Sequence, residues 1–230
     1  MRETRTLFAF LLVVALLVTV AVPAWADVQQ YVVVYGEFKP ANTQAGSGVL
    51  DDLATQALAS GALRFDVLQQ VDRPNFFALF EIWSNQSAYE AFLTSSGTQA
   101  IFVQLAALVQ APLDERDGTL IQGPVTPRDS HAAARQIFVI THVDIIPTFL
   151  NQAQPLILQF VIDSQGDPGV QTFALVSWDD ITNHFQLIEV FANQQAFDAH
   201  VSAQHTVTFR NSLQPFIGAP IDERLYQFGF

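Results

Sequence analysis

Two stretches of this chain repeat one another at a fixed distance, and this repeat limits the possible folds more than any other feature. Residues 75–116 align without a gap onto residues 183–224, at an offset of 108 and with 15 identities in 42 positions. Average composition predicts about three identities by chance. The agreement continues upstream through Gly61/Gly169 and Phe65/Phe173. The chain therefore contains two related units of about one hundred residues each, a normal length for a small domain.

Each unit shows the same predicted order: strand, helix, strand, strand, helix, strand. The third strand, FFALFEIW or HFQLIEVF, is apolar on both sides, so both faces of its sheet must be covered. Helices cover one face, and the sheet of the other unit can cover the second. We predict an α+β fold in which two βαββαβ repeats pack sheet to sheet as an intramolecular pseudo-dimer. Asn85 and Asn193 are predicted N-caps of the helices that follow.

The predicted elements have the following bounds. Strands are expected at 31–38, 63–71, 76–83, 136–143, 170–178 and 184–191, and the first helix of each unit at 43–60 and 147–164. The stretch at 117–133 contains Gly118, Gly123, Pro124 and Pro127, and it predicts a linker at 124–133 between a first domain, 28–123, and a second, 134–230.

The first 26 residues have the pattern of a secretory signal peptide. Arg2 and Arg5 precede an apolar run from Leu7 to Val22, and Ala24-Trp25-Ala26 fits a cleavage site. We expect a mature protein that begins at Asp27 and is exported to the periplasm or secreted. An uncleaved anchor is the alternative, although the run is short for the roughly 20 residues of a membrane span. No second run in the sequence approaches that length.

Charge and composition exclude several functions. Ten Lys and Arg against 22 Asp and Glu give a net charge of −12, which disfavours a nucleic-acid partner. The absence of cysteine excludes thiolate nucleophiles, disulfides and cysteine-ligated metals. The five histidines show no compact metal-binding spacing, so no metal site is predicted, and no nucleotide-binding glycine motif is present.

The second repeat resembles a known family. The stretch FANQQAFDAHVSAQHTVTF at 191–209 is similar to a motif of the antibiotic biosynthesis monooxygenase family. That resemblance implies a dimeric, ferredoxin-like α+β barrel. It also implies oxygenation of an aromatic or quinol-type molecule by O2 without a cofactor, although the family includes haem-degrading members and members of unknown activity. Fold alone does not decide among these.

The two repeats differ in their histidines, which suggests one retained site. His184, His200 and His205 of the second repeat align with Phe76, Phe92 and Gly97 of the first. Imidazole exchanges a proton near neutral pH, so we expect His200 and His205 to be the catalytic residues, facing a cavity between helix and sheet.

Further residues of the second repeat are expected to contact the substrate. Trp178 and Tyr226, expected on neighbouring strands, supply an aromatic wall, and Asn183, His184 and Glu189 supply polar contacts. Glu81 and Glu189 occupy the same position of the two repeats, including the repeat without the histidines. A structural ion pair with Arg116 or Arg224 is therefore the alternative to a functional role for these glutamates.

Three functions remain open from the sequence. The first is a monomeric, cofactor-free monooxygenase that uses a small aromatic or quinol-like substrate and O2. The second is haem binding or degradation, with His200 or His205 as the iron ligand. The third is a non-catalytic module that holds an apolar ligand.

Overall fold

The computed structural model describes residues 28–125 and 135–229. The predicted signal peptide, most of the predicted linker and His131 lie outside these ranges. Two units of the same architecture follow one another, each with four strands and three α-helices. In the first unit these are β1 Gln30–Glu37, α1 Thr43–Ala59, β2 Arg64–Gln70, β3 Phe76–Trp83, α2 Gln86–Thr94, α3 Ser96–Leu108 and β4 Asp114–Gln122. In the second they are β5 Ile137–Asp144, α4 Leu150–Ser164, β6 Val170–Trp178, β7 His184–Phe191, α5 Gln194–Ser202, α6 Gln204–Leu213 and β8 Asp222–Phe228.

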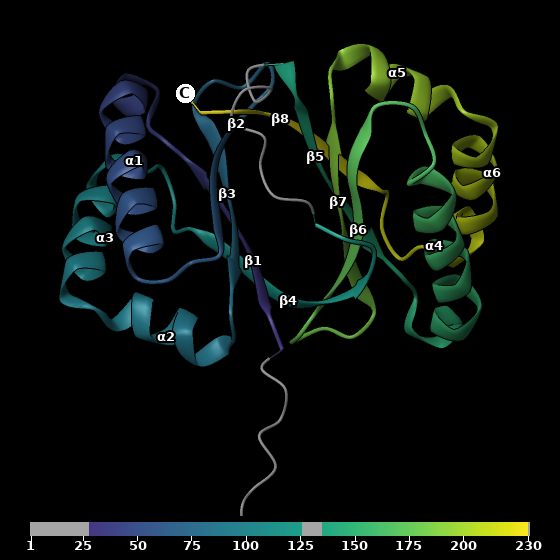
Figure 1. The fold of residues 1–230 in the computed structure, drawn as a ribbon, viewed down its shortest axis with the longest axis horizontal. Coiled ribbons are helices and arrows are strands. Elements are labelled where there is room, and N and C mark those ends of the chain that lie inside the picture. The colour runs from purple at the N-terminus through teal and green to yellow at the C-terminus, as the bar shows by residue number, and fades with distance from the viewer. Residues whose placement is uncertain (1–27, 126–134, 230) are drawn as a thin grey trace, which may run out of the picture.

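The eight strands form one closed antiparallel barrel with the order β1-β3-β2-β8-β5-β7-β6-β4. Each unit contributes a four-stranded sheet, and the last strand of each sheet pairs with the other unit, β4 with β6 and β8 with β2. The helices lie on the two outer flanks, α1 to α3 on one side and α4 to α6 on the other (Figure 1). The predicted α+β pseudo-dimer is confirmed.

Alternation along each strand divides the apolar residues into three cores. In β7, Phe185, Leu187 and Phe191 pack against the helices of their own unit, whereas Ile188 and Val190 point into the barrel. The barrel interior is a single core shared by both units. This two-sided burial explains why β3 and β7 are apolar at nearly every position.

Equivalent residues of the two units meet inside the barrel. Tyr35 of β1 lies opposite Ala78 of β3, and His142 of β5 lies opposite Gln186 of β7. Because Ala78 and Gln186 occupy the same position of the two repeats, Tyr35 and His142 are also structurally equivalent. The Tyr35 hydroxyl lies 2.7 Å from Nε2 of His142. Burial, together with Arg116 and Arg224, lowers the pKa of His142 to about 3, which keeps the imidazole neutral.

The second helix predicted for each unit is two helices in the structure. The chain breaks at Ser95 between α2 and α3, and at Ala203 between α5 and α6, where ψ is 143° and 144°. The Ser95 hydroxyl caps α3 by accepting from the Thr98 N–H. The predicted caps Asn85 and Asn193 are confirmed, because each side chain accepts a hydrogen bond from the backbone N–H three residues later. Within the described ranges, no single helix has the length and apolar character to cross a membrane; α2 and α3 pass that test only as a pair bent by 68°.

We expect the protein to be a monomer in solution. Each sheet already has its partner in the same chain, and the barrel leaves none of its eight strands with a free edge, so the contacts that drive dimerisation of a half-barrel are satisfied. Light scattering coupled to size exclusion should give the mass of one chain. A mass of two chains at micromolar concentration would contradict this prediction.

Candidate active site

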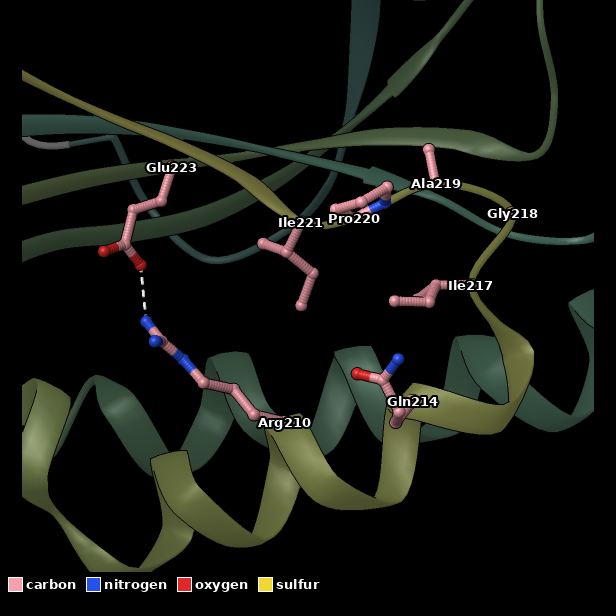
Figure 2. A pocket seen from close by; sticks show the side chains of 8 residues that line it. All are labelled: Arg210, Gln214, Ile217, Gly218, Ala219, Pro220, Ile221 and Glu223. Atoms are coloured by element: carbon pink, nitrogen blue, oxygen red, sulfur yellow. Dashed lines mark hydrogen bonds and ion pairs between the residues drawn. The ribbon is translucent and has the colours of Figure 1, made fainter.

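A pocket of about 440 Å³ opens between the C-terminal half of α6 and the segment that leads into β8 (Figure 2). The short 3-10 turn Gln214–Phe216 ends the helix, and the chain then returns along the pocket before β8 begins. Arg210 and Gln214 line the helix side, and residues 217–221 with Glu223 line the other side. The pocket is therefore formed by the helix layer and the sheet together.

An ion pair spans this pocket. Nη2 of Arg210 lies 2.5 Å from Oε2 of Glu223, and the two side chains are 41% and 25% exposed. Alternation along β8 sends Arg224 into the barrel and leaves Glu223 facing the helices, which is why Glu223 meets a residue of α6. Partial exposure leaves both charged groups accessible to a bound molecule.

A buried carboxyl group lies close to this ion pair. Glu189 of β7 is 3% exposed and accepts a 2.8 Å hydrogen bond from the Thr141 hydroxyl. The pKa of Glu189 is raised to about 8, mainly by burial; the Thr141 hydrogen bond and Arg210 oppose this rise, and Glu223 adds to it. At neutral pH the side chain of Glu189 is therefore mainly a neutral acid.

The first unit has a pocket at the equivalent place, with different chemistry. It measures about 270 Å³ and is lined by Phe102 and Ala106 where the second unit has Arg210 and Gln214. Its buried Glu81 accepts a 2.9 Å hydrogen bond from Nε1 of Trp83, and burial raises the pKa of Glu81 to about 8. The two halves thus keep the buried glutamate, but only the second carries the arginine.

None of the residues predicted from sequence lines the 440 Å³ pocket, although Glu189 lies near its ion pair. Arg210 and Glu223 were both missed. Glu223 belongs to the AP-x-DER stretch shared by the repeats, and Arg210 is the counterpart of Phe102. A charged residue replacing an aromatic one at the same repeat position was the available signal.

The structure brings His200 and His205 together, as expected, around an aspartate that was not predicted. Nδ1 of His200 lies 2.8 Å from Oδ2 of Asp167, and Nε2 of His205 lies 3.2 Å from the same oxygen. His200 is 3% exposed at the interface between α5 and the sheet, and burial lowers its pKa. His205 lines a separate surface groove of about 510 Å³ between α4 and α6. Of the two histidines, only His205 lines this groove.

Local backbone geometry explains why Asp167 reaches the histidines. The loop after α4 turns at Asp167-Pro168-Gly169, where the Val170 N–H donates to the Asp167 carbonyl. Gly169 has a φ of 86°, and a Cβ there would come within 2.6 Å of Cβ of Ala196 in α5. Glycine at this position lets the loop approach α5 closely and brings Asp167 beside His200.

The remaining predicted residues lie on strands of the second unit or in the turn before β7. Trp178 and Tyr226 both face the interior, but β5 and β7 separate their strands, so the expectation of neighbouring strands was wrong. The ring of Trp178 lies 5.1 Å from that of His184, which pairs with Asp144 at 3.1 Å. Asn183 donates a 2.7 Å hydrogen bond to the Ile145 carbonyl and so fixes a turn. Burial raises the pKa of Tyr226 to about 12.

The expected pairing of Glu81 and Glu189 with arginines was wrong. Arg116 bonds to Asp114 and Arg224 to Asp222, each two residues away on its own strand. Both arginines face the barrel interior, where each guanidinium lies 4.9 Å from the ring of Tyr35. The glutamates face the helices, on the opposite side of the sheet, so these charges cannot meet.

Residues 30–104 and 136–212 each match the family model for antibiotic biosynthesis monooxygenase. The chain belongs to the antibiotic biosynthesis monooxygenase family. The family domain thus occurs twice, in agreement with the repeats and with the two sheets of the barrel.

Solved structures share this fold over nearly the whole chain. Two proteins, each named "putative monooxygenase", come from Fusobacterium nucleatum and Lactobacillus acidophilus. The first has a TM-score of 0.76 at 14% identity and covers 89% of this chain and 94% of its own. The second has a TM-score of 0.69 at 12% identity and covers 88% and 94%. An anthrone oxidase-like protein has a TM-score of 0.68 at 10% identity and covers 89% and 92%. No curated protein matches the sequence.

Proposed function

We propose that this protein is a monooxygenase that oxidises a small aromatic, phenol- or quinol-type substrate with O2 and without a prosthetic group, in the second-repeat pocket. The observation that carries the proposal is the Arg210–Glu223 pair, which spans a pocket of suitable size close to the buried acid Glu189. Small-molecule sites have volumes of about 300–1,000 Å³ and a few converging polar groups. The equivalent pocket of the first unit lacks the arginine, which favours the second unit as the site.

The pocket contains groups that such a reaction needs. Glu223 is placed to accept a proton from a phenol or its keto form, and Arg210 to stabilise the resulting oxyanion. The electron-rich anion then reacts with O2 directly. For a ring methylene, one oxygen atom becomes the carbonyl oxygen and the other leaves in water with the two methylene hydrogens, so no external reductant is required. The anthrone oxidase-like neighbour supports anthrones as the first substrates to test.

Oxygen uptake with anthrones and naphthoquinols tests this function. The purified protein should consume O2 with no added flavin or metal, and Arg210→Phe should lower the rate by about 100-fold or more, as loss of an oxyanion donor does. Phe102 occupies this position in the first unit, so the change suits the architecture. Arg73→Gln, which removes an exposed arginine outside the pocket, is the matched control and should retain activity.

Two results would overturn this assignment. Uptake that survives Arg210→Phe but disappears in a His200→Phe/His205→Gln variant would move the reaction to the histidines, as the sequence alone suggests. Background uptake across the whole panel, with a folded protein, would instead favour a non-catalytic module for apolar ligands.

Haem binding receives less support from the geometry. The ring of His200 is enclosed by Phe160, Phe173 and Phe191 at centroid distances of 5.7, 5.1 and 5.2 Å, and its Nδ1 contacts Asp167. These neighbours enclose the His200 ring, which disfavours His200 as a ligand of haem iron. We also propose that the enzyme acts outside the cytosol, on the basis of the signal-like residues 1–26.

A further inference from the structure

Three metal-ligating side chains from three separate segments meet in the second unit. Asp167 comes from the loop after α4, His200 from the last turn of α5 and His205 from the first turn of α6. One donor atom from each residue lies within 4.8 Å of the other two. Two of these separations are 2.8 and 3.2 Å, both from the same aspartate oxygen.

These separations agree with coordination of one ion. Bond lengths of 2.0–2.2 Å to imidazole nitrogen and carboxylate oxygen imply about 3.3 Å between ligand atoms in a tetrahedral zinc site. Nε2 of His205 is buried and makes no hydrogen bond to any described residue, although it lies near the Asp167 oxygen. A cation between the three donors would give this nitrogen a partner.

The first unit provides an internal comparison. At the same offset of 108 it has Ala59, Phe92 and Gly97, so all three donors are absent together. Phe92 of α2 is the counterpart of His200 in α5, and it stacks on Trp83 at a centroid distance of 4.8 Å. A hydrocarbon ring therefore packs well at this position of the fold. The fold by itself therefore does not require a buried histidine at that place.

We propose that Asp167, His200 and His205 bind one divalent transition-metal ion, for which Zn²⁺ is the probe. Two imidazoles and one carboxylate favour zinc or ferrous iron over calcium and magnesium, which prefer oxygen ligands. Asp167 and His205 are 18% and 24% exposed, so one side of the ion faces solvent and admits water as a further ligand. The enclosing phenylalanines hold the His200 ring in place.

This site is distinct from the proposed oxygenation pocket. Arg210 follows His205 by five residues on α6, about 7.5 Å along the axis and about 140° around it. The residues that line the 440 Å³ pocket include none of the three donors. Metal binding and oxygen uptake are therefore separate properties with separate tests.

Calorimetric titration of the tag-free protein with Zn²⁺ tests the proposal. We expect one ion per chain, and at least a 100-fold weaker affinity in Asp167→Asn and in His205→Gln, because loss of a direct ligand exceeds the 10–100-fold effect of losing a ligand's partner. His184→Gln is the matched control, since His184 also pairs with one aspartate but belongs to no three-donor cluster among the described residues. It should retain the site.

Cobalt provides a second readout. Co²⁺ bound by two imidazoles and a carboxylate should give visible absorption that Zn²⁺ displaces, and His200→Phe should abolish it while keeping the packing that Phe92 has in the first unit. Zn²⁺ should also raise the melting temperature of the wild-type protein but not of Asp167→Asn. Absence of stoichiometric binding, or equal binding by wild type and by the Asp167 and His205 variants, would overturn the proposal.

Discussion

Replacing Glu81 and Glu189 together with glutamine should stabilise the protein above pH 7 and change its stability little near pH 4.5. The folded-state pKa of each carboxyl is raised from 4.5 to about 8, first of all by burial. Their contribution to the free energy of unfolding is therefore complete below pH 4.5 and is lost as the pH rises towards 8. The reason is that the folded state must then either hold a proton that the unfolded chain releases or bury a charge. Each carboxyl should lower the free energy of unfolding by about 3 kcal/mol as the pH rises from 5 to 8.

Urea unfolding at a series of pH values, for wild type and the double variant, measures this difference directly. Glutamine can accept the same hydrogen bonds from Trp83 and Thr141, so the variant removes the titration and keeps the contacts. Glu90→Gln, at an exposed position of α2, is the control and should leave the pH profile unchanged. Parallel profiles for wild type and the double variant would show that the two buried carboxyls do not titrate in this range.

The second large effect is expected at Phe160, where Phe160→Ala should lower the free energy of unfolding by about 3–5 kcal/mol. The Phe160 ring is 5% exposed and stacks on Phe209 at 3.9 Å, with an angle of 4° between the planes. It also packs edge-on against Phe173 at 5.3 Å and lies beside both histidine rings. Truncation removes this aromatic surface and leaves a cavity between α4, α6 and the sheet.

Denaturant unfolding at a fixed pH tests this expectation. Ile162→Ala on the same helix is the matched control, because Ile162 is 50% exposed and its loss should cost less than about 1 kcal/mol. A small loss at Phe160, similar to that at Ile162, would mean that the aromatic cluster relaxes to fill the space. The Zn²⁺ affinity of Phe160→Ala should also fall, since the ring holds both histidines in position.

Much of the fold was predictable because the evidence for it is periodic. The constant offset between the repeats identified two units. Because β3 and β7 are apolar on both sides, each sheet had to be covered on both faces. Neither break in the second helix was predicted: Ser95 carries a capping side chain at the break between α2 and α3, whereas Ala203 at the break between α5 and α6 carries none.

The site was less predictable because it depends on contacts between distant segments. His200 and His205 stood out by their absence from the first repeat, whereas Asp167 lies in an ordinary turn sequence and joins them only through the tertiary fold. The expected Glu189–Arg224 pairing failed because strand parity, which is unknown before the barrel is seen, puts those side chains on opposite faces of the sheet. The Arg210–Glu223 pocket likewise requires the return of residues 217–221 against α6.

The closure of both half-barrels within one polypeptide has a genetic consequence. In a barrel made from two copies of one chain, every substitution appears twice and identical side chains must face each other across the twofold axis. Here a tyrosine, Tyr35, faces a histidine, His142, at that place. Each half can therefore mutate alone, so one half can lose a chemical group, such as the arginine or the three donors, while the other retains it.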